Sequence, residues 1–446
     1  MTAQHDRRKP AVSLSPVRFT ALIVWSFART RWLQRFRTRA QVERAQQRSV
    51  TRHVNKLATM SPYIREVLEQ AGGDFHKIPL MDKTIMMERF DDLNTVGINR
   101  DEALDVAITA ERNRDFSTEL QGCSVGLSSG TSGHRGLFVV SPQERAQWAG
   151  TILARSLPPG KLRGHRIALF LRADNDLYQT IGSRAVTFEY FDVYAPMAKN
   201  LDRLAKFQPT ILVAPPSVLR DIAHAQAEGH LAVTPQKVMS VAEVLERTDE
   251  QFLTQAFHVP IIHQIYQATE GFLAHTCEQG TLHLNEDTVL VEREVVEGRR
   301  FIPIITDFRR TTQPILRYRL NDILLEREAP CPCGSVLTAI ERIEGRESDT
   351  FLIPTTSGTL QPVYGDMVSR SMLYATGFSD YRVVQTNPAE FTIYLDTPTP
   401  QAHESVIEEL TALIAPFQGV MPVVNFQPYS RDTSQKLRRI ERTFTP

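Results

Sequence analysis

The spacing of apolar residues changes twice along the chain and divides it into three parts. From about Arg29 to Gln70, apolar residues recur at intervals of three and four, and Gly72-Gly73 follows. This is the period of an amphipathic helix that ends at glycine. The sequence therefore predicts a helical leader over about residues 15–70.

Between residues 120 and 340, short apolar runs alternate with helical segments. RIALFLR, TILVAPP, KVMSVAE and PIIHQIY each have the length of a strand, and the helical segment SVLRDIAHAQAEGH separates two of them. Strands that alternate with helices are typical of a largely parallel sheet covered by helices.

After Gly345 the pattern is that of a smaller α+β unit, with two alternating runs (DYRVVQT, EFTIYLD), one helical pattern (SVIEELTALIAPF) and a basic tail. A chain of 446 residues exceeds the roughly 250 to 300 residues that a single core supports. We therefore expect an α/β protein of two domains. Residues 1–345 would form a large domain with mixed or parallel sheets and flanking helices, and residues 346–446 a small, mobile α+β domain.

Composition places the chain among folded globular proteins, with 42% hydrophobic and 23% charged residues. Lys plus Arg balances Asp plus Glu at 51 each, which argues against a nucleic-acid partner. Between Arg7 and Lys56, however, there are thirteen Lys and Arg residues and very few acidic ones. This segment suits either a solvated helix face or a peripheral contact with anionic lipid or a partner protein.

The apolar stretch Phe19–Phe27 is much shorter than the ~20 residues of a bilayer span and lacks a signal-peptide cleavage site. Four cysteines are too few for a secreted disulfide framework. The sequence therefore predicts a cytoplasmic location and says nothing about oligomeric state.

A loop dense in serine and glycine, VGLSSGTSGHRG, is the first segment with candidate chemistry. Small residues let phosphates approach backbone N–H groups, and the hydroxyls add further donors. The spacing is not that of a P-loop. The candidate phosphate-binding residues, which could also form a plain loop, are Ser128, Ser129, Gly130, Thr131, Ser132 and Gly133.

Three further segments carry charged candidates. In YQATEG, Glu270 ends an apolar run and could hold Mg²⁺ near phosphates, with Tyr266 and Thr269 beside it. In PILRYRLND, Asp322 could accept hydrogen bonds from two ribose hydroxyls, and the arginines could meet phosphate or carboxylate. In RIEGRESD, Arg346 follows a glycine where the composition changes, so this segment is either a hinge or a plain linker.

Cysteine and histidine spacing indicates a metal site. Five residues separate Cys277 from His283, and Cys331-Pro-Cys333-Gly follows about fifty residues later. Three thiolates and one imidazole would complete a closed, structural zinc site. His275 could replace His283, and CPCG could instead be a reduced turn.

In this order and at these separations, the segments resemble the superfamily of adenylate-forming enzymes, and most of all its phenylacetate-CoA ligase branch. SSGTSGHRG is similar to SSGT[TS]GxP loops, YQATEG to YGxTE, LRYRLND to IRYRTxD and IEGRESD to GRxDD. The resemblance covers about residues 45–446, and members of the branch also carry a CxxxxGxH…CxC arrangement.

The resemblance implies a role for each matched position. Ser128–Gly133 would wrap the β- and γ-phosphates of ATP, Glu270 would hold Mg²⁺, Asp322 would bind the ribose, and Arg346 would contact ribose or phosphate. Lys436, in SQKLRRIER, would bridge the carboxylate and the α-phosphate during adenylation. The implied reaction turns a carboxylic acid, aryl or acyl, into an acyl-adenylate and then transfers it to a thiol of CoA or of a carrier protein.

The chain departs from the family pattern at several positions. His134-Arg135 replaces the usual Lys-Gly or Lys-Pro, Gln267 replaces the glycine of YGxTE, and Ser348 replaces the first Asp of GRxDD. The segment LIPTTSGTLQPVYGDM matches the loop of the thioester stage only loosely. Two alternatives therefore stay open: adenylyl transfer to a hydroxyl, as in deazaflavin-cofactor synthetases, and a catalytically inactive binding protein.

Overall fold

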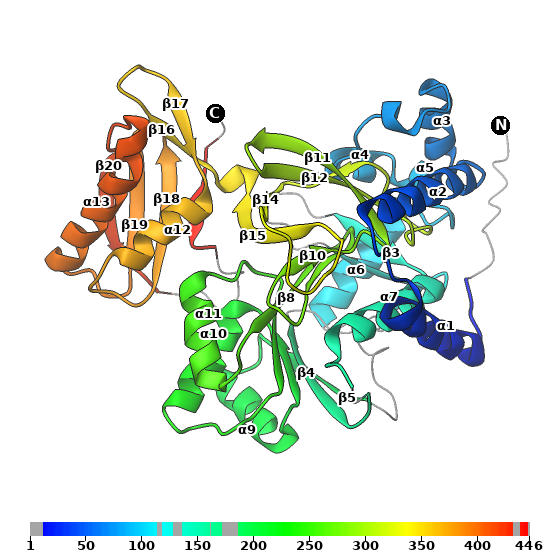
Figure 1. Cartoon of the computed structure of the whole chain (residues 1–446), viewed down its shortest axis with the longest axis horizontal. Helices are drawn as coiled ribbons and strands as arrows, with labels where there is room; N and C mark the ends of the chain where they lie inside the picture. Colours follow the sequence, from blue (N-terminus) through cyan, green and yellow to red (C-terminus); the bar gives the residue numbers. More distant parts are fainter. Residues whose placement is uncertain are drawn as a thin grey trace.

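The computed structural model describes residues 12–113, 118–127, 136–160, 162–171, 186–430 and 438–444 (Figure 1). The N-terminal part is helical, as the periodicity predicts, but it is broken into several pieces. These are α1 (Pro16–Ala28), a π-helical turn η1 (Arg29–Leu33), α2 (Arg39–Ala58) and α3 (Pro62–Gln70).

Side-chain caps account for these breaks. Ser15, Thr38 and Ser61 each accept a hydrogen bond from the backbone N–H three residues ahead, at the starts of α1, α2 and α3. Such caps satisfy N–H groups that would otherwise have no partner in the helix. A continuous apolar period therefore becomes three short helices. Among the described residues, no helix combines the length and apolarity that a bilayer span requires.

The other helical segments cover the sheets or connect their strands. They are η2 (Phe75–Lys77), α4 (Lys83–Glu88), α5 (Phe90–Leu93), α6 (Arg100–Asn113), α7 (Pro142–Ser156), α9 (Met197–Phe207), α10 (Pro216–Ala227), α11 (Arg247–Phe257), η3 (Glu347–Asp349), α12 (Gly365–Tyr374), α13 (Pro400–Ile414) and η4 (Ala415–Phe417).

The main sheet has twelve strands within the described ranges. Eleven follow the order β11-β12-β14-β15-β10-β9-β8-β7-β6-β4-β5, and β13 pairs with β12. The strands are β4 (His165–Leu171), β5 (Val186–Asp192), β6 (Ile211–Ala214), β7 (Lys237–Val241), β8 (Ile262–Ala268), β9 (Gly271–Thr276), β10 (Leu282–Leu284), β11 (Val289–Glu297), β12 (Arg300–Asp307), β13 (Tyr318–Arg319), β14 (Asp322–Glu326) and β15 (Ala339–Arg346).

The predicted α/β class with mixed sheets is confirmed, but the parallel part is smaller than the alternation of strands and helices suggests. β4 to β8 pair in parallel with one another, whereas every pairing from β8–β9 onward to β11 is antiparallel. A separate antiparallel sheet holds β1 (Glu119–Leu120), β2 (Cys123–Leu127) and β3 (Leu137–Val140).

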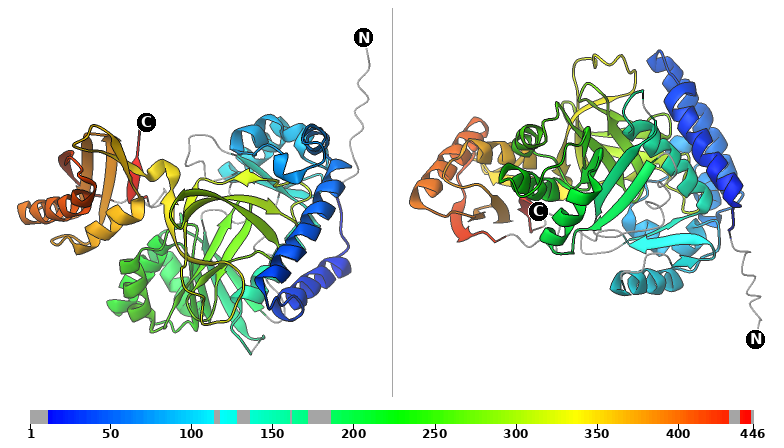
Figure 2. Two further views of the ribbon diagram at one scale, coloured as in Figure 1. Left: turned by 45° about the horizontal axis from the view of Figure 1, so that its top comes forward. Right: turned by 90° about the horizontal axis from the view of Figure 1, so that it is seen from below.

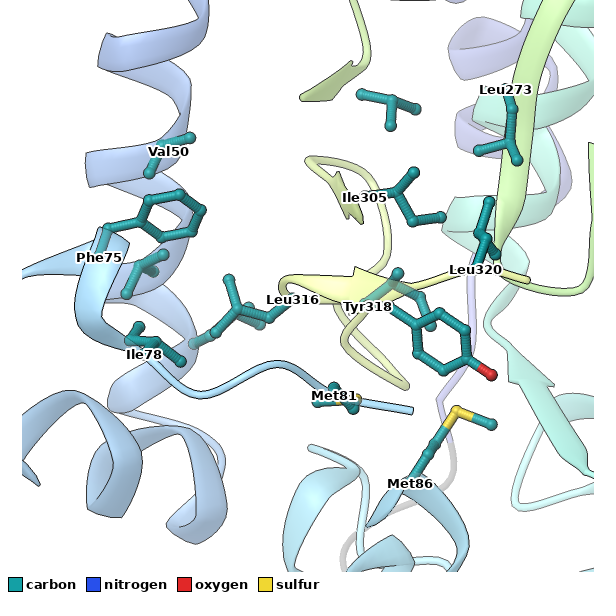
Figure 3. Close-up of a cluster of buried hydrophobic side chains, with 14 of the residues drawn as sticks. Val50, Phe75, Ile78, Met81, Met86, Leu273, Ile305, Leu316, Tyr318 and Leu320 are labelled. Carbon is teal, nitrogen blue, oxygen red and sulfur yellow. The ribbon is translucent and has the colours of Figure 1, made fainter. Parts of the chain in front are cut away.

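Separate apolar clusters hold the helices on the sheet. Apolar side chains of α9, α10 and α11 pack on one face of the parallel strands, and those of α7 pack on the other. The antiparallel half is covered by α2 and α3, whose side chains meet β12 and the segment around Leu316 (Figure 3). Val50, Phe75, Ile305 and Tyr318 belong to this cluster. The two halves of one sheet are thus fixed by different helices.

The C-terminal part has its own core. A four-stranded sheet in the order β20-β19-β18-β21 packs with α12 and α13, and a hairpin of β16 and β17 precedes it. Its strands are β16 (Phe351–Pro354), β17 (Leu360–Val363), β18 (Tyr381–Asn387), β19 (Glu390–Leu395), β20 (Val423–Pro428) and β21 (Ile440–Arg442). This part lies at one end of the long axis and α1 at the other (Figures 1 and 2).

Helix α1 lies against α7 so closely that one glycine is required. A Cβ at Gly150 of α7 would lie 2.3 Å from the carbonyl oxygen of Ile23 and 2.8 Å from the Cβ of Ser26. Because the obstacle includes backbone, a side chain there must push the helices apart.

Gly150→Ala should therefore loosen α1 and cost about 1–3 kcal/mol, as overpacking does. We expect trypsin to cleave the variant faster after Arg29 and Arg35, as followed by mass spectrometry of the released fragments. Gly365→Ala is the matched control, because its Cβ would find its nearest neighbours at an ordinary 3.5 Å. Equal cleavage rates for the two variants would contradict tight packing of α1.

Candidate active site

A cavity of about 2080 Å³ lies at the edge of the main sheet where the parallel strands end. Parallel strands in α/β proteins commonly bind ligands outside their carboxyl ends. The residues at or just after the ends of β4, β5, β6, β7 and β8 line this cavity: Leu171, Asp192, Pro215, Ala242 and Ala268. The arrangement identifies this cavity as the candidate site.

Asp322 lies in the lining of the cavity beside two other candidate residues, Tyr266 and Arg346. The Tyr266 hydroxyl donates a hydrogen bond of 2.5 Å to Asp322 Oδ2. Arg346 Nε lies 3.9 Å from Asp322 Oδ1, and the two residues are opposite one another in the β14–β15 register. Burial and the neighbouring Asp322 carboxylate raise the pKa of Tyr266. Tyr266 is therefore a hydrogen-bond donor that fixes the direction of the carboxylate.

Glu270 occupies the two-residue turn between β8 and β9. Its carboxylate accepts a hydrogen bond of 2.9 Å from Thr269 Oγ1 and also interacts with Tyr318, whose pKa is raised by burial and by Glu270. A half-exposed carboxylate at the end of a strand has the chemistry of a Mg²⁺ ligand, because Mg²⁺ in phosphate sites takes one or two carboxylates and keeps several waters. Glu270 and Thr269 line the same cavity as Asp322.

A buried group to which the sequence analysis assigned no role lies below this turn. Asp307, at the end of β12, lines the cavity, and its Oδ2 would lie 2.7 Å from a Cβ at Gly271, so glycine is required there. Burial raises the pKa of Asp307 to about 6, against the opposing effects of Arg309 and Arg310. Arg310 Nη1 donates to the Thr269 carbonyl at 3.0 Å and so supports the turn. The only sequence signal was an aspartate at the end of the apolar run FIPIITD.

The arginines of LRYRLND pair with protein carboxylates. Arg317 forms an ion pair with Glu292 at 3.1 Å and donates to the Ile78 carbonyl. Arg319 lines the cavity and pairs with Glu294 at 2.7 Å and with Glu347 at 3.0 Å. Each guanidinium group thus has at least one protein carboxylate as a partner.

Two predicted nucleotide contacts lie outside the described residues: the loop Ser128–Gly133 and Lys436. The described residues that flank the loop, Leu127 and Gly136, both line the cavity. Arg438, two positions after Lys436, lines it as well and contacts the Asp349 carboxylate.

Buried charges join the C-terminal part to the large domain beside the cavity. Arg439 Nη1 lies 2.9 Å from Asp249 Oδ2 and 3.6 Å from Glu246 Oε2, and the Tyr381 hydroxyl donates to Glu246 at 3.0 Å. Arg439 also pairs with Asp380 of its own domain at 3.3 Å, and Arg220 of α10 reaches the same carboxylate at 3.3 Å. The network fixes one orientation of the C-terminal part.

The four predicted zinc ligands come together away from the cavity. The ligand atoms of Cys277, His283, Cys331 and Cys333 all lie within 4.8 Å of one another. Cys277 and Cys331 sulfurs are 3.8 Å apart, and Cys333 Sγ is 3.4 Å from His283 Nε2. A tetrahedron with zinc–sulfur bonds of about 2.3 Å has edges of about 3.8 Å, so the spacing fits zinc.

The surroundings of the cluster fit this interpretation. The backbone N–H groups of Gln279 and Ser335 each approach a cysteine sulfur at 3.4 Å, and His283 Nδ1 lies 3.1 Å from the Leu337 carbonyl oxygen. A hydrogen bond from Nδ1 would leave Nε2 for a metal. His275, the alternative ligand, instead has Nδ1 2.7 Å from Asn285 Oδ1 and contacts Arg155.

Solved structures share the fold of the whole chain. A structure titled 2-hydroxyisobutyryl-CoA ligase in the postadenylation state aligns with 99% of this chain and 94% of its own, at 16% identity and a TM-score of 0.67. The same ligase in its thioesterification state has a TM-score of 0.52, with the same coverage and 17% identity. ATP-bound MatB from Rhodopseudomonas palustris aligns with 70% of this chain and 65% of its own, at 15% identity and a TM-score of 0.51.

Sequence similarity to characterised proteins is partial. Protein CapK of Staphylococcus aureus is 32% identical over 154 residues, which are 33% of this chain and 34% of CapK. The chain thus spans about a third of the length of the curated relative that it matches. No protein-family model matches the chain.

The buried carboxyl of Asp307 leads to a prediction on pH. Because the pKa of this carboxyl rises from 3.8 to about 6 on folding, the folded state holds its proton longer than the unfolded state. Its contribution to the free energy of unfolding therefore falls as pH rises from about 4 to about 6, by up to about 3 kcal/mol, and is constant above that.

Asp307→Asn should remove this term. We expect the melting temperature of the variant to improve relative to wild type as pH rises through this window, because Asn carries no ionisable proton. Differential scanning calorimetry of both proteins across the window tests this. A pH-independent difference would contradict a raised pKa at Asp307.

Proposed function

We propose, from the adenylate-forming ligase fold that this chain adopts, that the protein activates a carboxylic acid with ATP. The products of the first step would be an acyl-adenylate and pyrophosphate. The acyl group would then pass to the thiol of CoA or of a carrier protein. The branch-level resemblance to phenylacetate-CoA ligases, carried by LRYRLND, IEGRESD and CPCG, is part of the proposal.

One observation carries the proposal: a single cavity is lined by Glu270, by the Tyr266–Asp322–Arg346 cluster and by Arg438 of the C-terminal part. These residues span more than 160 positions of the sequence, from Tyr266 to Arg438. Their convergence at the carboxyl ends of parallel strands supports one nucleotide site, assembled from both domains.

In this proposal different residues bind different parts of the nucleotide. Asp322, held by the Tyr266 hydroxyl, would accept hydrogen bonds from the ribose, with Arg346 beside it. Ser128–Gly133 would surround the phosphates. Glu270 would bind Mg²⁺, which when bound offsets phosphate charge. Lys436 would offset the charge that develops as the carboxylate attacks the α-phosphorus.

An apolar cavity of about 110 Å³ supports an apolar acid as the substrate. It lies between α7 and the parallel strands, and five of its lining residues also line the large cavity: Trp148, Leu171, Ala242, Ile265 and Gln267. A carboxylate in the large cavity could thus place an aromatic ring or a short branched chain in the small one. Ile152, Leu169, Phe188 and Val213 supply apolar walls for such a group.

The Cys₃His cluster would hold a structural Zn²⁺. Four ligands leave no open position for a substrate or water, which is typical of structural rather than catalytic zinc. The ligands connect the end of β9, strand β10 and the loop before β15. The ion would supply folding free energy in this region and take no part in the reaction.

The reaction is tested by acid-dependent pyrophosphate release with MgATP over a panel of aryl and short branched acids, with mass spectrometry of the product. We expect release with at least one apolar acid, and an acyl thioester when CoA or a carrier thiol is added. Asp322→Asn should raise KM for ATP about tenfold, because it weakens a charge-assisted hydrogen bond. Lys436→Ala should lower kcat about 100-fold or more.

Lys206→Ala, an exposed lysine of α9, is the matched control and should leave both constants unchanged. Silence over the whole panel with a folded protein would refute the activation of an acid. A product that keeps AMP on a hydroxyl acceptor would instead establish the adenylyl-transfer alternative.

The zinc proposal predicts about one Zn²⁺ per chain in protein purified without chelator, measured by inductively coupled plasma mass spectrometry. Cys331→Ser should lose the metal and lower the melting temperature, because it leaves an incomplete ligand set. Cys123→Ser is the control, since Cys123 is buried in a different apolar cluster with α6 and β3. Metal-free wild-type protein of unchanged stability would disprove the site.

A further inference from the structure

Large apolar side chains gather on the outward face of α1 and η1. Within the described ranges, fifteen large apolar residues are clearly exposed, and five of them lie between residues 17 and 33. They are Val17 (80% exposed), Val24 (62%), Trp25 (57%), Trp32 (49%) and Leu33 (61%). Single exposed apolar residues are normal, but a contiguous set usually marks an interaction surface. We call these five residues the α1 face.

The α1 face is held rigidly toward solvent. The opposite side of α1 packs on α7 around Gly150, where Ser26 is buried. Arg31 donates to the carbonyl oxygens of Ala154, Leu157 and Pro158, at 2.8, 3.1 and 2.9 Å, and so ties η1 to the end of α7. The helix is therefore an integral part of the domain, and its exposed residues need no rearrangement to meet a partner.

The charges around the α1 face have one sign. Residues 12–42 contain six arginines and no Asp or Glu. Arg31 and Arg39 have partners within the chain: Arg31 donates to backbone carbonyls at the end of α7, and the exposed Arg39 forms an ion pair with the buried Glu286 at 2.6 Å. Arg18, Arg35 and Arg37 are exposed beside the apolar residues. Apolar side chains bordered by cations complement a surface that has an apolar interior and an anionic outer layer.

We infer that the α1 face docks the protein on an anionic phospholipid membrane. Tryptophan prefers the boundary between headgroups and acyl chains, and a helix with a bordering basic set can lie in that boundary with its apolar side immersed about 5–10 Å. Stable association needs two weak contributions, apolar burial and attraction to anionic lipid, and the α1 face has both.

The position of α1 lets the protein dock on a membrane without covering the C-terminal part. The C-terminal part lies at the opposite end of the long axis (Figure 1), so docking through α1 leaves it clear of the membrane. The inference rests on the α1 face alone and does not depend on the proposed enzyme activity.

The test is flotation of the full-length protein with vesicles of phosphatidylcholine, with and without phosphatidylglycerol. Wild type should bind the anionic vesicles and be released by high salt. Trp25→Ser with Trp32→Ser should lower the partition coefficient by about tenfold or more, because two buried rings are lost. Arg35→Gln with Arg37→Gln should lower it about fivefold for each charge on anionic vesicles and leave binding to neutral vesicles unchanged.

Val295→Ser with Val296→Ser is the matched control, because these valines are exposed on β11, outside the α1 face, at 67% and 44%. It should bind like wild type, and all variants should keep the wild-type melting temperature. Absence of vesicle binding, or equal binding by the tryptophan variant, would overturn the inference. A third result would also overturn it: wild-type protein that does not bind vesicles, forms a dimer by light scattering, and becomes a monomer when the two tryptophans are replaced. The α1 face would then bind a second copy of the chain.

Discussion

The reversal of strand direction between β8 and β9 is the constraint on which the candidate site depends. Up to β8 the strands are parallel and their carboxyl ends open on one edge, whereas β9 returns antiparallel after Thr269 and Glu270. The return places Glu270 in the lining of the cavity. It also brings Gly271 against Asp307, where no side chain fits. The glycine of YQATEG is thus a geometric requirement of the sheet, within a candidate chemical motif.

The orientation of the C-terminal part depends on buried charges at its contact with the large domain. Arg439 meets Asp249 and Glu246, and a buried arginine that lost its partners would carry a large desolvation penalty. Any turn of the C-terminal part must therefore exchange the Arg439 network for contacts of similar strength.

The sequence predicts local structure correctly where the spacing of apolar residues fits only one kind of element. RIALFLR, KVMSVAE and PIIHQIY became β4, β7 and β8, because buried parallel strands are continuous apolar runs. The breaks in the leader were missed, since Thr38 and Ser61 act through capping bonds rather than through hydrophobic period. Mixed sheets were predicted, but not which strands would run antiparallel: pairing direction depends on which strands become neighbours, and a period does not carry that information.

In the candidate site, too, some features could be predicted from the sequence and others could not. Arg317, Arg319 and Arg346 have the same chemistry in the sequence, and each lies near a protein carboxylate, but Arg319 and Arg346 do so in the lining of the cavity. No role was predicted for Asp307, because its raised pKa comes from burial in the folded protein. Short motifs indicate which residues can do chemistry, and long-range packing decides which of them face a ligand.

The Cys₃His cluster links a short sequence motif to long-range packing. Strand β10 pairs with β9 on one side and with β15 on the other, so it stands between the strand that follows Glu270 and the strand that ends at Arg346. β10 is only three residues long and forms few ladder hydrogen bonds. Four ligands from the end of β9, from β10 and from the loop before β15 would hold these strands together where the ladder is short. A metal there would act on the site at a distance, by fixing the spacing between the carboxylate turn and the arginine.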